Sequence, residues 1–281
     1  MQTLDTLIKM LLSGRNLHIS VLDLSGILDL EETKLPFKST IHSKDFCYIA
    51  KETEMGRRVC YRCKALANEK AAREKCAFEG VCSWGIYEYC LPVMIGDSTS
   101  AVVYVGNAII DEDAQRARLI QTASHAKADT KRLLSKFEEA ERLESSAELG
   151  AIAEIVADYL TLLYEKAPKV ESRHHWLVSA MKRYAEKAYS EPITLAELGA
   201  TYRKNAKYLG RLFKEEMKMS YSDYVLSIRL DHAKKMLVTT DSKIIEIALA
   251  SGFNNVSYFN RVFFQKNGIS PGGFRKLQST K

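Results

Sequence analysis

Residues 195–220, LAELGATYRKNAKYLGRLFKEEMKMS, and residues 244–270, IIEIALASGFNNVSYFNRVFFQKNGIS, decide the fold of this chain, because the second stretch imperfectly repeats the first. In each stretch a short helical segment is followed by a turn and a second helical segment. The second segments share the order Tyr-(Leu/Phe)-x-Arg-(Leu/Val)-Phe, at Tyr208–Phe213 and Tyr258–Phe263. This order of elements is the helix-turn-helix unit, whose second helix enters the major groove of DNA. The alternative is a plain helical bundle with solvated polar faces, which two units in matched register disfavour.

The spacing of large apolar residues predicts which side of each second helix faces outward. Leu209 and Phe213 lie four residues apart and share one buried face, and Phe259 and Phe263 do the same in the second unit. The opposite sides are left for contacts with DNA. Arg and Asn side chains match the edges of guanine and adenine with paired hydrogen bonds. The candidate DNA-binding residues are Lys207, Arg211 and Lys214 in the first unit, beside Gly210, and Asn255, Ser257, Asn260 and Arg261 in the second.

The charge distribution favours nucleic acid as the partner of the C-terminal third. Residues 170–281 contain 19 Lys and Arg against 10 Asp and Glu, a net charge of +9, whereas residues 1–169 contain 22 against 25, a net charge of −3. A basic region of this kind attracts polyanions, although a solvated basic surface is the simpler interpretation. No apolar run reaches the roughly 18 residues that a membrane span needs. We therefore expect a cytoplasmic protein of at least two domains, with double-stranded DNA as partner and no membrane association.

The C-terminal region resembles the DNA-binding domain of the AraC/XylS family over residues 175–277. The resemblance implies two helix-turn-helix units joined by a long helix at about 221–237, in an all-α domain spanning 169–281, and it implies RNA polymerase as a partner. Gly199 and Asn205 depart from the usual pattern in the first unit, and Gly210, which has no side chain, leaves this unit fewer direct base contacts. The matching residues are Arg229-Leu230, Ala233, Leu237, Ile247-Ala248, Gly252-Phe253, Tyr258-Phe259, Arg261, Phe263, Gly268 and Pro271.

The N-terminal part predicts an α+β domain over residues 1–125, with a small mixed sheet flanked by helices. Residues 18–26 are typical of a strand that runs into a turn, and residues 81–95 and 100–109 of an antiparallel hairpin. This part also resembles the PocR-type sensory domain, which implies a PAS-like fold that binds a small-molecule effector. The matching pieces are LHISVLDLSG, Phe46-Cys47, Gly56-Arg57-Arg58-x-Cys60, Cys82-x-x-Gly85, Leu91-Pro92-Val93 and Tyr104-Val105-Gly106.

Residues 126–168 predict a helical linker between the two domains. An apolar stripe that includes Ile152, Ile155, Tyr159 and Leu162 runs along this segment, which ends before Pro168. One interpretation is a helix that makes the protein a homodimer and relays the signal. The other is a helix packed on the sheet of its own chain.

All six cysteines lie between Cys47 and Cys90, which is typical of metal binding or redox chemistry in a cytosolic chain. Cys60 and Cys63 are three residues apart and share a helix face. One interpretation is a four-thiolate site of Cys47, Cys60, Cys63 and Cys82 that holds zinc or an iron–sulfur cluster. The alternatives are small thiols that fill a core, or a thiol–disulfide switch.

Aromatic residues in the predicted strands are candidates for effector binding, namely Trp84, Tyr87 and Tyr104, although such residues also fill ordinary cores. The sequence contains no Gly-rich phosphate loop, GxSxG or HExxH motif, so no catalytic residue is assigned. We therefore expect a DNA-binding transcription regulator that responds to a small-molecule, metal or redox signal. The rival hypotheses are a metal- or thiol-based redox enzyme with a DNA-localising domain, and an architectural DNA-binding protein.

Overall fold

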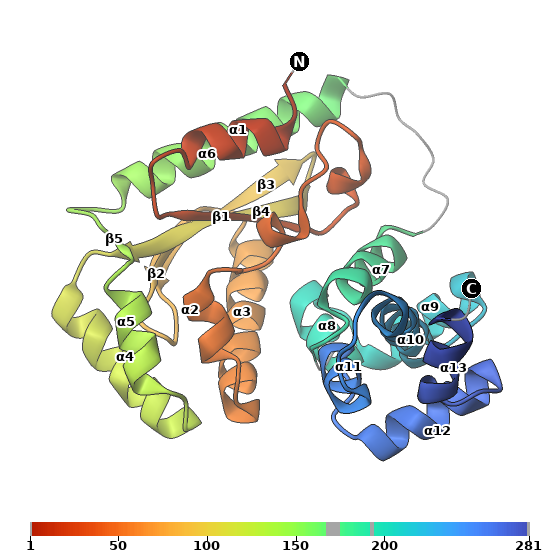
Figure 1. Cartoon of the computed structure of the whole chain (residues 1–281). Coiled ribbons are helices and arrows are strands. Elements are labelled where there is room, and N and C mark those ends of the chain that lie inside the picture. Colours follow the sequence, from red (N-terminus) through yellow and green to blue (C-terminus); the bar gives the residue numbers. More distant parts are fainter. Residues whose placement is uncertain (1, 167–174, 192–193, 280–281) are drawn as a thin grey trace. The chain divides into compact units, whose positions relative to one another are not determined.

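The computed structural model describes residues 2–166, 175–191 and 194–279. The chain divides into two compact units (Figure 1). The first comprises Met1–Leu177 with Gly199–Lys204, and the second comprises Val178–Leu198 with Asn205–Lys281. Within the described ranges, no helix is both long and apolar enough to cross a membrane.

The N-terminal unit is built on a mostly antiparallel sheet, as the sequence predicts. The strands β1, β4, β3 and β2 lie in that order, and β5 pairs in parallel with β4. The hairpin of β3 and β4 turns at Gly96. The region 81–95, predicted as one strand, is divided by a turn at Gly85, where φ is +85° and a side chain would collide with the Gln115 carbonyl. The strands are β1 (His18–Asp23), β2 (Phe78–Val81), β3 (Tyr87–Ile95), β4 (Ser98–Ile109) and β5 (Glu141–Arg142).

The two faces of this sheet have different chemistry. Alternate residues of β1 and β4, such as Ile19 and Val105, pack in an entirely apolar core with helices α1 (Leu4–Leu11) and α6 (Ala147–Lys166). The other residues, such as Leu22 and Tyr104, face α3 (Glu54–Glu74). Figure 1 shows α1 and α6 on one side of the sheet and α3 on the other. Because side chains along a strand alternate between the two faces of a sheet, the register of β1 and β4 places every second residue of each strand on the side of α3.

Helix α6 lies within residues 126–168, where the sequence predicts a linker separate from the N-terminal domain, but it packs as part of that domain. Its buried residues Leu149, Val156 and Leu160 belong to the same core as β1 and β4, so the segment up to Lys166 is packed within the N-terminal unit. Ile152, predicted to lie at a dimer interface, is 7% exposed and is part of this core. Ile155 and Leu162 remain exposed. The interpretation of a helix packed on its own sheet therefore describes α6 over Ala147–Lys166. Residues 167–174 lie outside the described residues.

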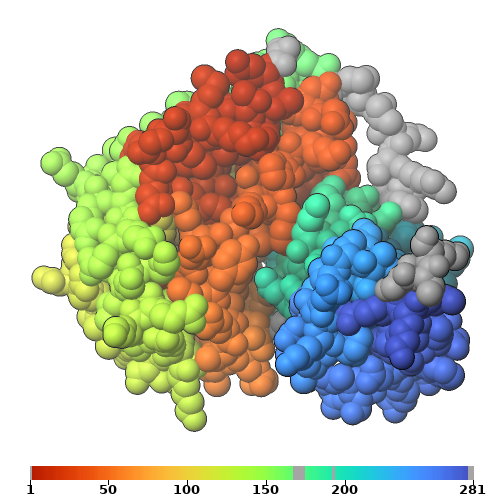
Figure 2. Space-filling model, viewed as in Figure 1, coloured from red at the N-terminus to blue at the C-terminus, as the bar shows by residue number. Residues whose placement is uncertain are grey.

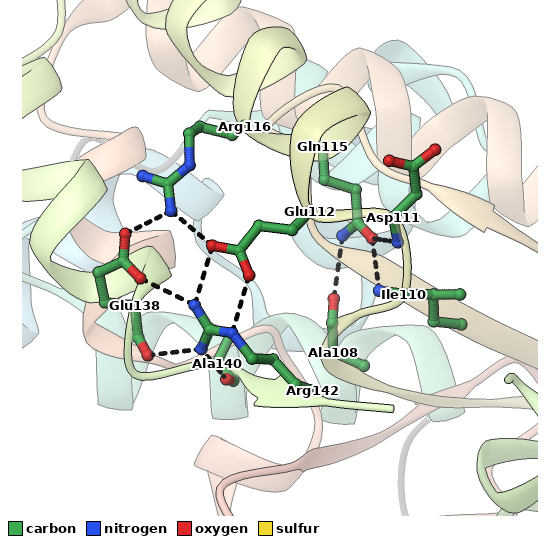
Figure 3. A network of polar contacts seen from close by, with 9 residues as sticks. All are labelled: Ala108, Ile110, Asp111, Glu112, Gln115, Arg116, Glu138, Ala140 and Arg142. Carbon is green, nitrogen blue, oxygen red and sulfur yellow. Dashed lines mark hydrogen bonds and ion pairs between the residues drawn. The ribbon is translucent and has the colours of Figure 1, made fainter. Parts of the chain in front are cut away.

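Three further helices complete the N-terminal unit and share a second apolar core. The three helices are α2 (Asp45–Ala50), α4 (Glu112–Ala126) and α5 (Thr130–Phe137). An exposed network of ion pairs joins two of them, α4 and the C-terminal end of α5, to β5 (Figure 3). Arg116 and Arg142 each contact both Glu112 and Glu138, at 2.6–3.1 Å. An exposed ion pair adds little stability by itself, so the main effect of the network is to hold α4, the end of α5 and β5 in fixed positions relative to one another. In Figure 2, helices α2 and α3, coloured orange, lie at the surface of the N-terminal unit.

The C-terminal region is entirely helical, as predicted. The side chain of Asn205 caps one recognition helix by accepting from the Lys207 amide, and Asn255 caps the other by accepting from the Tyr258 amide. Gly252 forms the turn before the second with φ +85°, where a side chain would meet the Tyr189 carbonyl. The helices are α7 (Trp176–Ala188), α8 (Leu195–Tyr202), α9 (Ala206–Met217), α10 (Tyr221–Thr239), α11 (Ile244–Ala250), α12 (Val256–Asn267) and α13 (Pro271–Ser279), with short 3-10 turns at Ile27–Asp29 and Phe37–Ser39 in the first unit.

Candidate nucleic-acid interface and buried polar cluster

The first candidate site is the outward side of helix α9. Leu209 and Phe213 are fully buried, which fixes the orientation of the helix. Lys207, Arg211 and Lys214 are exposed on the other side, as their spacing predicts. Arg211 lies 3.8 Å from Glu215 one turn later, and both side chains are well exposed. This contact is weak enough to be exchanged for a phosphate or a base edge.

Helix α12 presents a different outward side. Phe259, Val262 and Phe263 are buried, and Ser257, Asn260 and Arg261 are exposed. The Arg261 guanidinium lies 5.5 Å from the centre of the Tyr258 ring, where the cation and the ring attract each other. This contact uses the positive charge of the guanidinium and none of its hydrogen-bond donors, which can still serve a base.

Asn255 has a second role that limits it as a reader of bases. Its side-chain oxygen accepts a hydrogen bond from the Tyr258 amide at 3.0 Å and so begins helix α12. The oxygen keeps a second lone pair, but this bond holds it at the start of the helix, so the NH2 group of the side chain is the freer of the two to contact DNA. A bidentate contact with adenine needs both groups, so Asn260 is the better placed of the two asparagines.

The second candidate site is a chain of polar contacts between α3 and the sheet. The Lys64 ammonium lies 2.9 Å from Nε2 of His42 and 3.1 Å from the centre of the Tyr104 ring. Nδ1 of His42 lies 3.1 Å from the Glu88 carboxylate. Since a lysine ammonium can only donate, Nε2 of His42 accepts and Nδ1 donates to Glu88. The three residues form a relay from α3 to β3.

Burial changes the proton affinity of every group in this relay. It raises the pKa of Glu88 to about 7 and lowers the pKa of His42 well below its usual value. It also lowers the pKa of Lys64, an effect that Glu88 opposes. His18, which hydrogen-bonds the Ile41 carbonyl at 2.9 Å, has its pKa lowered to about 4 by burial. Groups with perturbed pKa values that gather in one place are typical of functional sites.

The aromatic residues predicted to bind an effector do not come together. Trp84 is buried with α2, α4 and α5, and Tyr87 packs against the core on the side of α6. Of the three, Tyr104 alone lies beside the polar relay. Sequence reasoning missed His42, Lys64 and Glu88. The signal available was Glu88 itself, an acidic residue within the otherwise apolar and aromatic stretch YEYCLPVMI.

The four cysteines predicted to bind a metal are all free and partly buried. Burial raises the pKa of Cys47 to about 12, of Cys60 to about 11, and of Cys82 well above its usual value, so these thiols are protonated at neutral pH. Across residues 2–166, 175–191 and 194–279, no group of three or more His, Cys, Asp or Glu residues is placed to hold a metal ion. Zinc and iron–sulfur clusters are bound by thiolates, so a metal held by these cysteines would have to displace the protons of the thiols.

Comparisons with known proteins assign both parts of the chain. The family described as "Sensory domain found in PocR" matches residues 21–167, and the family described as "Helix-turn-helix domain" matches residues 198–277. The HTH-type transcriptional regulator YfiF of Bacillus subtilis is 35% identical over 119 residues, which are 41% of this chain and 38% of the relative. The melibiose operon regulatory protein of Escherichia coli is 31% identical over 111 residues, 39% of this chain and 37% of the relative.

Among solved structures, the C-terminal domain of AraT, a response regulator from Geobacillus stearothermophilus, is 29% identical. It covers 38% of this chain and 88% of that chain, with a TM-score of 0.37. For YfiF and the melibiose operon regulatory protein, the match spans less than two fifths of the length of the relative.

Proposed function

This chain belongs to the PocR sensory-domain family and carries an AraC-type helix-turn-helix domain, and from this premise we propose that it regulates transcription by binding specific DNA sequences. The observation that carries the proposal is the pair of helices α9 and α12. Both bury the face that holds them in the domain, and both expose Arg at the same place in the repeat. The net charge of +9 over residues 170–281 suits a phosphate backbone.

The two helices would read DNA in different ways. Lys207, Arg211 and Lys214 on α9 would contact phosphates and guanine. On α12, Arg261 would pair with guanine and Asn260 with adenine, with Ser257 beside them. In this arrangement α9 supplies mainly affinity, and α12 supplies more of the sequence discrimination.

We also propose that the N-terminal unit receives the signal at the relay of Lys64, His42 and Glu88. Placing three partly buried ionisable groups next to one another is costly unless they are paired or serve a ligand. A small-molecule effector that hydrogen-bonds these groups would change the contacts between α3 and the sheet. RNA polymerase as a partner of the DNA-bound protein follows from the family resemblance. A homodimer remains a prediction, which would use the exposed Ile155 and Leu162 on α6.

Replacement of Arg261 by alanine is expected to weaken binding to a selected operator by about 1–3 kcal/mol, or roughly 5- to 150-fold, and to relax specificity at one base pair. Arg211→Ala is expected to weaken binding as well. The measurement is fluorescence anisotropy with operators selected from random duplexes, at one fixed salt concentration. The charge-matched control is Lys235→Ala on α10, which removes one positive charge outside both recognition helices. Wild-type affinity in both Arg variants would contradict the assignment of these helices to DNA.

The four-cysteine metal site is a separate prediction, and elemental analysis of anaerobically purified protein tests it. A zinc site would be colourless and an iron–sulfur cluster would be brown. Because the thiols must lose protons to bind a metal, the apparent affinity is expected to rise with pH. Cys60→Ser and Cys82→Ser should abolish stoichiometric metal, whereas Cys76→Ser, at an exposed cysteine, should retain it. Protein with no bound metal, and wild-type stability in the Ser variants, would make these cysteines packing residues.

A further inference from the structure

An exposed phenylalanine interrupts the polar side of helix α12. Phe264 is 57% exposed, whereas its neighbour Phe263 is fully buried. On the helix, Phe264 lies one turn beyond Arg261 and two turns beyond Ser257, so the three side chains form one outward stripe. Figure 2 shows the end of the chain that contains α12, coloured blue, at the surface. A large exposed apolar side chain on such a stripe indicates a contact with a partner.

The internal repeat shows that this phenylalanine replaces a cation. When Tyr208 is aligned with Tyr258, and Arg211 with Arg261, Phe264 falls opposite Lys214. Lys214 is exposed on α9 and suits a phosphate. A phenyl ring cannot bind phosphate, so the second unit must use this position differently from the first.

The chemistry of the major groove offers one apolar group. Thymine carries a 5-methyl group at the groove edge, and apolar side chains such as phenylalanine distinguish it from the other bases by direct contact. One turn before Phe264 lie Asn260 and Arg261, and a polar and positively charged surrounding favours nucleic acid over an apolar protein surface. We propose that Phe264 reads the 5-methyl group of a thymine in the operator, an inference that rests on the proposed DNA-binding function.

The geometry limits where this thymine lies. Three residues of α-helix advance by about 4.5 Å, and successive bases on one strand are about 3.4 Å apart. The thymine is therefore adjacent to the base contacted by Arg261, or one step beyond it. The operator read by α12 would thus contain guanine and thymine within about two base steps of each other.

The test removes only the methyl group. Each thymine of the selected operator is replaced in turn by deoxyuridine, and affinity is measured with the full-length protein. At one position we expect wild-type affinity to fall about fourfold, as removal of one buried methyl group predicts. Phe264→Ala should bind the unmodified operator at least fourfold more weakly and should no longer respond to deoxyuridine there. Arg261→Ala, the matched control, should bind weakly yet keep its sensitivity to deoxyuridine.

Three other outcomes would overturn the inference. Wild-type protein that is insensitive to deoxyuridine at every thymine would exclude contact with a methyl group. Equal deoxyuridine sensitivity in Phe264→Ala and wild type would assign the methyl contact to another residue. Wild-type DNA affinity in Phe264→Ala would indicate that the ring serves a protein partner. Failure of the proposed function is distinct, because then no operator would be selected from random duplexes at all.

Discussion

Replacement of Phe259 by alanine is expected to destabilise the second helix-turn-helix unit by about 3–5 kcal/mol. The Phe259 side chain is fully buried, and its ring centre lies 4.9 Å from that of Phe253 and 5.6 Å from that of Phe263. Removing it leaves a cavity where α10, α11 and α12 meet. Because domains are stable by only about 5–15 kcal/mol, we expect rapid hydrogen exchange throughout α11 and α12 and loss of operator binding.

Phe264→Ala provides the matched control for this prediction. It removes the same side chain from the same helix, but from an exposed position, so the free energy of unfolding should change by less than about 0.5 kcal/mol. The measurements are urea unfolding and hydrogen–deuterium exchange of peptides from α10 to α12 in the full-length protein. Equal destabilisation by the two variants would show that the core does not contain Phe259 as described.

Replacement of Glu88 by glutamine is expected to remove a pH-dependent loss of stability from the N-terminal unit. Burial raises the pKa of Glu88 from 4.5 to about 7. Below pH 4.5 the carboxyl is protonated in both folded and unfolded chains and makes no difference. Between pH 4.5 and 7 the unfolded chain loses the proton while the folded chain keeps it, so wild-type stability falls as pH rises. The total loss is about 3 kcal/mol, and it is complete above pH 7.

Urea unfolding at pH 5 and pH 8 measures this effect, with Trp84 as the fluorescent reporter and Trp176 replaced by phenylalanine in both proteins. The stability of Glu88→Gln relative to wild type should increase by about 2.5 kcal/mol between the two pH values, because a small part of the loss has already occurred at pH 5. His18, whose pKa is lowered to about 4, has the opposite dependence, but it is present in both proteins and cancels in the difference. The groups around Glu88, namely His42, Lys64 and the thiols of Cys82 and Cys90, are present in both proteins, and the charge of Glu88 raises the pKa of Lys64 and of both thiols in the wild type alone. A difference that is independent of pH would contradict the burial of this carboxyl.

The sequence by itself determined the C-terminal domain. In this domain the signals in the sequence are local, because each specifies structure within a few neighbouring positions. They are the capping residues Asn205 and Asn255, the turn at Gly252, and the four-residue spacing of Phe259 and Phe263. A helix buries one stripe, so the buried stripe also identifies the exposed one. The outward position of Arg211 and Arg261 was predictable for this reason. Residue type alone does not show that Phe264 is exposed, because its neighbour Phe263 is a buried phenylalanine.

Only the tertiary structure decided where α6 packs and which residues form the relay of Lys64, His42 and Glu88. On the predicted stripe Ile152 is buried, whereas Ile155 and Leu162 are exposed. The stripe alone does not identify which surface covers Ile152. Trp84 and Tyr87 are close in sequence but pack in different cores, and Tyr104 packs in a third. His42, Lys64 and Glu88 come from a loop, a helix and a strand that are far apart along the chain. Such contacts depend on strand register and on helix packing across the sheet, and no local pattern encodes either of them.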